Sequence, residues 1–290
     1  MIRAAKEGTI VSRKLKLLCV FAHPDDESLG DGGTLAKYAR EGVETHLLSA
    51  TRGERGRSGN TGESPGPEVV GRIREAELRA AAKELAVTGV TFLDYQDGDL
   101  DKADPAEVIG RIVSHIRRIQ PDVVVTFGPD GGYGHPDHIA ISQFTTAAVT
   151  CSADPTYLAT DGLAPHRVSK LYYFAWREAT WAAYQDALRQ ISFNVDGEPR
   201  NAISWPDWMV TTTLDTRAHW KQVWRAVCCH KTQMSIYKGL TKLSDERHET
   251  LWGVQEFYRV FSLVNSGRRA ETDLFEGLRE TKESVRVNAA

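Results

Sequence analysis

Short aliphatic runs alternate with helical patterns through the first half of the sequence, and this alternation is the strongest constraint on the fold. It predicts strands at 16–22, 43–50, 90–94 and 122–127, and helices near 31–41, 68–87 and 105–119. Strands that alternate with helices form a mostly parallel sheet with helices on both faces. We therefore expect a three-layer, Rossmann-like α/β fold. In the strand order 3-2-1-4, which such sheets use, the first and fourth strands are neighbours.

Two of the predicted helices carry further signals. Asp104 precedes Pro105, which is a good N-cap residue followed by a good first helical residue. Ile73, Ala76 and Ala80 fall on one face of the 68–87 helix, and we expect that face to be buried.

The second half of the chain is less regular. We expect a strand at 170–176, a helix at 178–190, an irregular Pro/Trp segment at 197–209, a strand at 209–214, a helix at 216–235 and a final strand at 256–264. No linker rich in Gly, Ser or Pro separates the halves. The sequence therefore predicts one domain over 1–290, with a core at 14–150, an elaborated C-terminal part at 151–265 on the substrate side, and a polar tail at 266–290.

Charge and cysteine usage limit the partners and the compartment. A net charge of −3 gives no overall attraction to nucleic acid or to an anionic membrane. The four cysteines show no C-x-x-C spacing, which favours buried thiols in a reducing compartment over a disulfide framework. No apolar run approaches the roughly 18 residues that span a bilayer, and the N-terminal apolar stretch lacks a cleavage site. We expect a cytoplasmic protein without a membrane span.

Polar side chains gather where two predicted strands end. "AHPDDE" (22–27) follows the first strand and "GGYGHPDH" (131–138) follows the fourth. Neighbouring parallel strands end at the same edge of a sheet, so the two motifs should meet there. Buried carboxylates without partners cost several kcal/mol, so this cluster needs a partner.

A divalent metal is the partner that the residue types favour. His23 and Asp26 can bend around one ion, and a third ligand can come from "HPDH" (135–138). Two imidazoles and one carboxylate are typical of catalytic zinc sites, whereas magnesium and calcium prefer all-oxygen shells. Ferrous iron uses the same ligand set and stays open. Asp25 points away from its neighbour Asp26 and could serve as a general base. For Glu27, capping of the next helix is the simpler interpretation.

The two motifs resemble the signatures of the LmbE-like (PIG-L) superfamily of metal-dependent N-acetylglucosaminyl deacetylases. "RIREAEL" (72–78), "TTTLD" (211–215) and "HKTQM" (230–234) extend the resemblance over most of the chain. The resemblance implies that His23, Asp26 and His138 bind zinc and that Asp25 is the general base.

The resemblance also implies roles around the metal. His135 would polarise the developing oxyanion or help to protonate the leaving amine. Asp137 would orient a neighbouring histidine, and Tyr133 would be a mobile residue that reaches the reacting carbonyl. Arg74 would hold a polar group of the substrate. His230 would line the pocket, with a capped or core position as the alternative.

Two further stretches are candidates for substrate selection. "RGERGRSGNTGE" (52–63), which begins with Arg52, packs three arginines among four glycines at the same edge of the sheet. It is either a mobile lid that grips the substrate or a solvated loop. Trp205 and Trp208 could stack on a sugar face, although such tryptophans more often fill a core.

The favoured function is hydrolysis of an N-acetyl group from an N-acetylglucosamine-type conjugate, releasing acetate and a free amine. An amidase that cleaves a larger acyl group is the alternative, and the aglycone and any homo-oligomer stay open. A nucleotide-binding Rossmann-like module is disfavoured, because Leu35 replaces the third glycine after Gly30 and Gly32. A structural zinc protein would require a closed set of four ligands.

Overall fold

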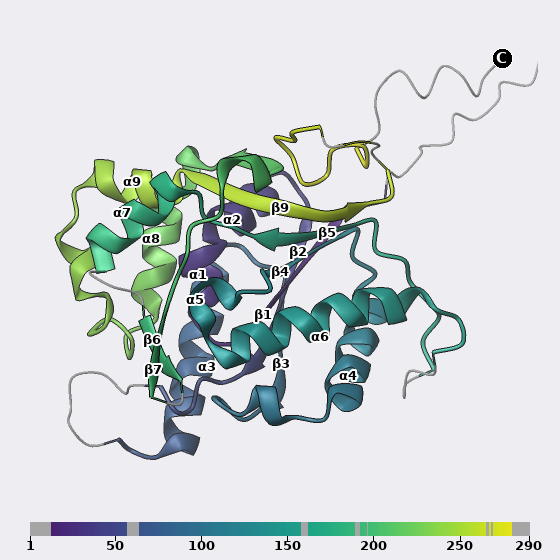
Figure 1. The fold of residues 1–290 in the computed structure, drawn as a ribbon, viewed down its shortest axis with the longest axis horizontal. Coiled ribbons are helices and arrows are strands. Elements are labelled where there is room, and N and C mark those ends of the chain that lie inside the picture. The colour runs from purple at the N-terminus through teal and green to yellow at the C-terminus, as the bar shows by residue number, and fades with distance from the viewer. Residues whose placement is uncertain are drawn as a thin grey trace, which may run out of the picture.

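A single mixed sheet forms the centre of the protein in the computed structural model, which describes residues 13–56, 64–157, 162–188, 192–195, 197–264, 267 and 269–279. Within these residues, seven strands pair in the order β3-β2-β1-β4-β5-β9-β8 (Figure 1). They are β1 (Lys16–Phe21), β2 (Glu44–Thr51), β3 (Gly89–Tyr95), β4 (Val123–Phe127), β5 (Lys170–Phe174), β8 (Thr212–Asp215) and β9 (Val254–Ser262). Pairs from β3 to β5 are parallel, whereas β9 is antiparallel to β5 and β8. The predicted α/β fold and the central order 3-2-1-4 are confirmed.

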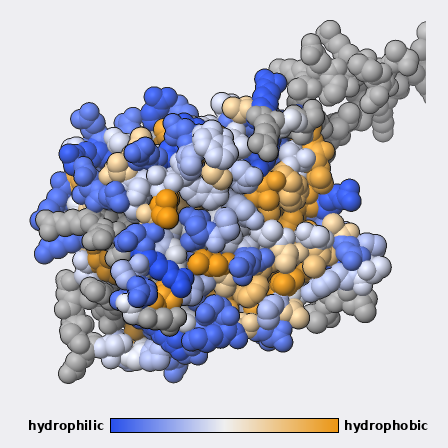
Figure 2. Space-filling model, in the orientation of Figure 1, coloured by the Kyte–Doolittle hydropathy of each residue, from blue (hydrophilic) through white to orange (hydrophobic). Residues whose placement is uncertain are grey.

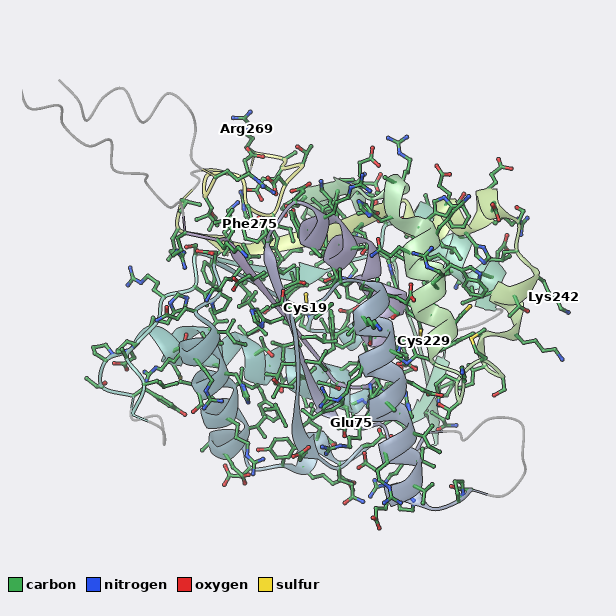
Figure 3. All side chains as sticks on the ribbon, turned by 180° about the vertical axis from the view of Figure 1, so that it is seen from behind. Cys19, Glu75, Cys229, Lys242, Arg269 and Phe275 are labelled. Carbon is green, nitrogen blue, oxygen red and sulfur yellow. The ribbon has the colours of Figure 1, made fainter. Side chains whose placement is uncertain are left out.

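Helices cover both faces of the sheet. On one face lie α4 (Pro105–Ile119) and α6 (Pro136–Ala153), which pack on each other in front of the sheet in Figure 1. On the other face lie α2 (Gly32–Arg40), α3 (Pro67–Glu84) and α8 (Trp220–Cys229), which are in front when the molecule is seen from behind (Figure 3). The remaining elements are the short α1 (Asp26–Gly30) and α5 (Gly131–Gly134), the helices α7 (Glu178–Leu188) and α9 (Asp245–Trp252), and the hairpin of β6 (Ser192–Val195) and β7 (Glu198–Asn201).

The core lies between these layers. Residues 17–22, from β1 and the residue that follows it, are at most 1% exposed, and residues 123–125 of β4 are fully buried. The face seen in Figure 2 is mainly hydrophilic, with a hydrophobic area right of centre above α6. All four cysteines are free thiols, but only Cys19, in β1, is buried as expected, whereas Cys151, Cys228 and Cys229 are half-buried. Among the described residues, no helix combines the length and the apolar composition that crossing a bilayer requires.

The predicted buried face of α3 is wrong. Ile73 is 39% exposed, and Ala76 and Ala80 also face solvent. The buried side instead carries Arg74 and Glu77 next to Val70, Leu78 and Ala81. Because two charged residues interrupt this face, hydropathy pointed to the opposite side of the helix. The cap of α4 is confirmed, since the Asp104 side chain accepts the N–H groups of Ala106 and Glu107.

Several boundaries in the second half differ from expectation. The helix predicted at 216–235 ends at Cys229, because His230 has φ −80° and ψ 62° and leaves the helical region. Helices α6 and α9 and the β6–β7 hairpin were not predicted. Part of the predicted polar tail, 269–279, packs back on the sheet with Leu274 and Phe275 fully buried. Residues 266, 268 and 280–290 of that tail lie outside the described residues.

Candidate active site

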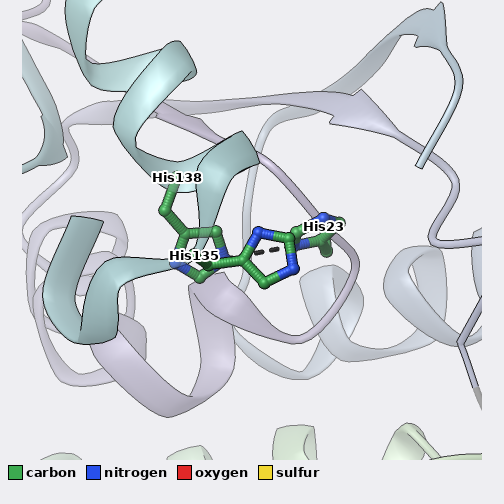
Figure 4. A group of neighbouring side chains, drawn as sticks. All are labelled: His23, His135 and His138. Atoms are coloured by element: carbon green, nitrogen blue, oxygen red, sulfur yellow. Dashed lines mark hydrogen bonds between the residues drawn. The ribbon is translucent and has the colours of Figure 1, made fainter. Parts of the chain in front are cut away.

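The segments after β1 and β4 meet at the carboxyl edge of the sheet. The two strands pair directly, with Leu17 opposite Val123. This pairing brings together His23 and His138, which are 115 residues apart, with 3.1 Å between His23 Nδ1 and His138 Nε2 (Figure 4). The structure therefore joins the two motifs as the strand order predicts.

Asp26 completes a set of three close donor atoms. Its Oδ1 lies 3.4 Å from His138 Nε2, and its Oδ2 lies 3.8 Å from His23 Nδ1. Ligand atoms of a tetrahedral zinc ion at 2.0–2.1 Å are roughly 3.4 Å apart, so these separations suit one ion. The carboxylate is fixed because Oδ2 also accepts the N–H groups of Ala22 and His23, at 3.2 and 2.8 Å.

The outer nitrogens of both imidazoles are already committed. His138 Nδ1 lies 3.1 Å from the carbonyl oxygen of Gly131 and must donate to it, so Nε2 carries the lone pair. His23 Nε2 lies 3.1 Å from both Asp137 Oδ2 and Asp97 Oδ1, so in the neutral ring the lone pair lies on Nδ1. In that form two lone pairs face each other across 3.1 Å, and they repel unless a proton or a metal ion lies between them. The donor set therefore fits a bound metal ion.

The electrostatics of the site also favour a positive charge near His23. Burial alone would lower its pKa, but hydrogen bonds to Asp137 and Asp97 raise the pKa well above its ordinary value. For His138, burial and then the charge of His23 lower the pKa well below the usual value, which keeps this ring neutral. A metal ion binds only the neutral form of each imidazole, and the negative charge of the nearby carboxylates favours binding of that ion.

Asp137 and Asp97 hold His23 from the outside. Fully buried Asp137 accepts the N–H groups of Gly98 and Leu100, at 2.7 and 3.1 Å, besides its contact with His23. Burial would raise the pKa of Asp97, but His23 lowers it to about 2. The sequence analysis missed Asp97. Its position directly after the third strand, at the same edge of the sheet, was the available signal.

A third imidazole, His135, lies beside the other two (Figure 4). Its ring centroid is 4.8 Å from that of His23 and 4.9 Å from that of His138, and one nitrogen of each ring lies within 4.8 Å of the others. His135 Nδ1 accepts the N–H of Asp137 at the start of α6, so the neutral ring carries its proton on Nε2. Burial, and then the charge of His23, lower the pKa of His135 to about 4.

The Asp25 carboxylate binds different groups from those that contact Asp26. Its Oδ2 accepts a hydrogen bond from the Tyr237 hydroxyl at 2.6 Å and another from Arg74 Nη2 at 3.1 Å. The Arg74 guanidinium also donates to the carbonyl oxygens of Pro24 and Gly53, at 2.5 and 2.9 Å. Arg74 lines the cavity, but its terminal nitrogens bind the protein around Asp25.

Glu27 does more than cap a helix. Its Oε2 accepts the N–H of Asp25 at 2.9 Å, while its Oε1 lies 2.8 Å from His230 Nε2. Both side chains are 1% exposed, so His230 lies behind α1 and does not line the cavity. Burial alone would raise the pKa of Glu27, but His230 lowers it, and Glu27 in turn raises the pKa of His230 against the effect of burial.

A cavity of about 500 Å³ opens in front of these groups, a size suited to a small-molecule ligand. The polar residues that line it are His23, Asp25, Asp26, Arg55, Arg74, Asp97, Tyr133, His135, Gln233 and Tyr237, and the apolar ones are Leu29, Phe127, Phe174, Trp176, Tyr184 and Ile236. Arg52 is outside this cavity, because it pairs with Glu75 and Asp94 at a separate depression.

The other stretches considered for substrate selection are only partly at the cavity. Arg55 and Gly56 line it, but 57–63 of the proposed lid lie outside the described residues. Trp205 and Trp208 do not line the cavity, and Trp208 is 79% exposed. The tryptophan that lines the cavity is instead Trp176, two residues after the end of β5.

The chain is similar to proteins that are named as deacetylases. The family described as PIG-L, GlcNAc-PI de-N-acetylase, matches residues 18–149. The chain is 35% identical over 295 residues to a 1D-myo-inositol 2-acetamido-2-deoxy-alpha-D-glucopyranoside deacetylase of Rhodococcus jostii, covering 91% of this chain and 98% of that relative. A second relative of the same description, from Kineococcus radiotolerans, is 32% identical over 91% of this chain and 83% of its own length.

A solved structure adds support for the fold alone. N,N'-diacetylchitobiose deacetylase from Pyrococcus horikoshii has a TM-score of 0.63 at 22% identity, over 84% of this chain and 83% of that protein. The mostly parallel sheet with its two helical layers is thus an architecture that this deacetylase shares.

Proposed function

Because the chain belongs to the PIG-L (LmbE-like) family of deacetylases, we propose that it removes the N-acetyl group from an N-acetylglucosamine conjugate, releasing acetate and a free amine. The relatives named above act on a conjugate of this sugar with inositol, which makes an inositol conjugate the first substrate to test. The observation that carries the proposal is the convergence of His23, Asp26 and His138 beside the carboxylate of Asp25.

His23, Asp26 and His138 are proposed to hold a zinc ion. When bound, zinc supplies Lewis acidity, which polarises an amide carbonyl and lowers the pKa of water. Ferrous iron accepts the same ligands, so the identity of the metal is decided by experiment. Asp137 and Asp97 hold the His23 ring in the orientation that presents Nδ1.

Asp25 is proposed to move the proton. It takes a proton from the attacking water as the water oxygen bonds to the amide carbon. It then returns that proton to the nitrogen as the C–N bond breaks, so that a neutral amine and acetic acid form, and the acid loses its proton to solvent as acetate. Arg74 and Tyr237 both donate to Asp25 Oδ2, which leaves the carboxylate fixed beside the metal ligands.

His135 and Tyr133 are proposed to stabilise the developing oxyanion. His135 presents Nε2–H as a donor, because its Nδ1 already accepts a backbone N–H and its low pKa keeps the ring neutral. Of the two roles that the resemblance implies, this tautomer favours the oxyanion over the leaving amine. Burial, and then Asp26, raise the pKa of Tyr133 well above its usual value, so its hydroxyl stays a donor.

The apolar residues that line the cavity favour the amidase alternative as a second candidate function. The apolar side of the cavity, formed by Leu29, Phe174, Trp176 and Tyr184, is larger than an acetyl methyl group requires. A longer acyl chain could lie against these side chains. Hydrolysis of the amide by the same residues would follow in either case.

An acetate-release assay over N-acetylglucosamine conjugates, including the inositol conjugate, tests the proposal. We expect acetate release that a chelator abolishes and that added zinc or ferrous iron restores. Measured metal content, together with turnover by each reconstituted form, identifies the ion. Stoichiometric metal without hydrolysis of any acylated amino sugar would instead support a structural metal site.

A further inference from the structure

We infer that the segment 230–237, here called the brace, positions Asp25 for catalysis through His230 and Tyr237. This inference rests on the proposed role of Asp25 as the base. The brace begins directly after Cys229, the last residue of α8, which Figure 3 labels. It contains "HKTQM", a motif that the mechanism above leaves without a role.

Asp25 has a backbone conformation that needs support. Its φ of 117° and ψ of −24° lie in a region that residues other than glycine rarely adopt. Such a residue costs of order 1–3 kcal/mol and persists only where its surroundings enforce the conformation. The groups that bind Asp25 are therefore candidates for positioning residues.

The first contact of the brace reaches the backbone of Asp25 through Glu27. His230 Nε2 lies 2.8 Å from Glu27 Oε1, and Ser28 Oγ donates to the same oxygen at 2.5 Å. Glu27 Oε2 is then free to accept the N–H of Asp25. Because Glu27 and His230 are almost fully buried, no solvent replaces either partner when the other is removed. His230 thereby fixes the carboxylate that holds the strained residue.

The second contact binds the side chain of Asp25 directly. The Tyr237 hydroxyl donates to Oδ2 at 2.6 Å, and Arg74 Nη2 donates to the same oxygen at 3.1 Å. Among the described residues, both side-chain donors to Asp25 thus reach one oxygen. Oδ1 is consequently the oxygen that accepts the proton from water.

A third contact anchors the brace without touching Asp25. Thr232 donates its backbone N–H and its hydroxyl to the two carboxylate oxygens of Glu77 on α3, at 2.9 and 2.7 Å. Thr232 and Glu77 are each 8% exposed. Thr232 lies in the brace, like His230 and Tyr237, but it contacts α3 and not Asp25. Its substitution is therefore a matched control for the effect of a general loss of stability.

Kinetics of four single variants test the inference on the best N-acetylglucosamine conjugate. We expect Tyr237→Phe, Glu27→Gln and His230→Gln each to lower kcat about 10- to 100-fold, the loss that small misplacements of a catalytic group produce. Metal content should change less than about twofold, because none of the three residues is a proposed metal ligand. KM should also change less than about twofold in Glu27→Gln and His230→Gln, because these two side chains do not line the cavity, whereas Tyr237 does. Thr232→Val should lower the melting temperature but keep kcat within about twofold of wild type.

Coupling between Glu27 and His230 separates positioning from general destabilisation. If His230 acts through Glu27, kcat of the double variant Glu27→Gln/His230→Gln should be no lower than kcat of the less active single variant. Multiplied losses, or variants of Tyr237 and Glu27 that keep the wild-type kcat, would overturn the inference while leaving the proposed deacetylation intact.

A crystal structure of His230→Gln provides a readout that does not depend on activity. We expect Asp25 to relax from its positive φ and to lose the hydrogen bond from its N–H to Glu27. An unchanged φ near 117° in a folded His230→Gln variant would contradict the brace even if no acetylated substrate were found. Absence of acetate release by the wild type would contradict the proposed function instead.

Discussion

Nε2 of His23 lies 3.1 Å from Oδ2 of Asp137, and this contact turns the opposite ring nitrogen toward His138. The Asp137 carboxylate is itself fixed by two backbone N–H groups from the segment after β3, those of Gly98 and Leu100. The orientation of one proposed metal ligand thus depends on segments that follow three different strands. Such outer contacts commonly set the affinity of a metal site.

Asp137→Asn should weaken metal binding by about 10- to 100-fold, because an amide holds the His23 ring less strongly than a carboxylate does. Competition with a chromophoric chelator measures the affinity directly. Asp273→Asn, which alters a carboxylate bound to Tyr38 and Arg279, serves as the control and should leave the affinity unchanged. Equal metal affinity in Asp137→Asn and wild type would remove this role from Asp137.

Asp25→Ala should retain the metal and lose about 10²- to 10⁴-fold in kcat, the usual contribution of a general base. The proposed ligand atoms of His23, Asp26 and His138 contact one another, whereas the Asp25 carboxylate is bound by Tyr237 and Arg74, so metal content should stay close to that of wild type. Elemental analysis and initial rates on the same preparation check both parts. Full activity in this variant would rule out Asp25 as the base.

The first half of the fold and the meeting of the two motifs could be predicted because they follow from local patterns. Buried parallel strands read as continuous aliphatic runs, and their order decides which loops share an edge. His23 and His138 could therefore be paired across 115 residues of sequence. The spacing of Asp25 and Asp26 likewise indicated that the two carboxylates face different groups.

The partners of the buried polar groups could not be predicted, because they depend on tertiary packing. Hydropathy placed α3 on the wrong side, since Arg74 and Glu77 occupy its buried face. The sequence gives no sign that α8 ends before His230, and that ending is what sends His230 toward Glu27. Charged residues on a buried face break the hydrophobic periodicity from which buried faces are predicted. Such exceptions are expected mainly at functional sites.

Replacement of Asp31 should change how stability depends on pH. The carboxyl is fully buried, one oxygen has no partner among the described residues, and burial raises its pKa from 3.8 to about 7. The folded state therefore binds this proton more tightly than the unfolded state, so the contribution of Asp31 to stability falls as pH rises from about 4 to 7. At pH 8 the ionised Asp31 carboxylate lowers the free energy of unfolding by an amount that corresponds to the whole pKa shift, about 4 kcal/mol at most.

Asp31→Asn removes this titration and should be more stable than wild type at pH 8, with the difference shrinking toward pH 4. Urea unfolding across that range gives the two curves. Cys19 still finds an acceptor, because the Asn amide oxygen can replace the carboxylate oxygen that now lies 3.1 Å from its Sγ. Parallel curves for the two proteins would show that Asp31 does not titrate in this window.

Glu271 should be required for stability and dispensable for catalysis. It is 2% exposed and accepts from Lys170 Nζ at 2.7 Å and from the Tyr172 hydroxyl at 2.6 Å, and Arg259 Nη1 lies 2.7 Å away. Glu271→Ala leaves the buried Lys170 charge without its partner, which costs about 3–5 kcal/mol. Lys170 begins β5, at the edge of the sheet opposite the candidate site, so kcat of the folded variant should stay unchanged.

Denaturant unfolding with Glu198→Ala as an exposed control measures the loss. If Glu271→Ala lowers the free energy of unfolding no more than Glu198→Ala does, the contacts of Glu271 with Lys170, Tyr172 and Arg259 do not stabilise the fold. A lower kcat at full metal content would show that the two edges of the sheet are coupled.

Acyl groups larger than acetyl should be accepted, because apolar rings lead away from the proposed metal ligands. Phe127 stacks on His138 with 4.0 Å between ring centroids, Phe174 lies 5.8 Å from Phe127, and Trp176 lies 4.9 Å from Phe174. The Tyr184 hydroxyl is committed to the carbonyl oxygen of Leu29 at 2.6 Å, so its ring adds apolar surface to the cavity. We expect kcat/KM for N-propionyl and N-butyryl conjugates within about tenfold of the N-acetyl value, since each buried methylene gains about 0.8 kcal/mol.

Gly30→Ala provides a selective test of where the acyl group lies. A Cβ at this position would lie 3.4 Å from the Phe174 ring, an ordinary contact that narrows the cavity without a clash. If the acyl chain extends along Phe174, the variant should lose several-fold more kcat/KM on N-butyryl than on N-acetyl substrate, because one methyl group in a hydrophobic pocket discriminates by about 10-fold or more. Equal losses on both substrates would show that the acyl chain does not extend along Phe174.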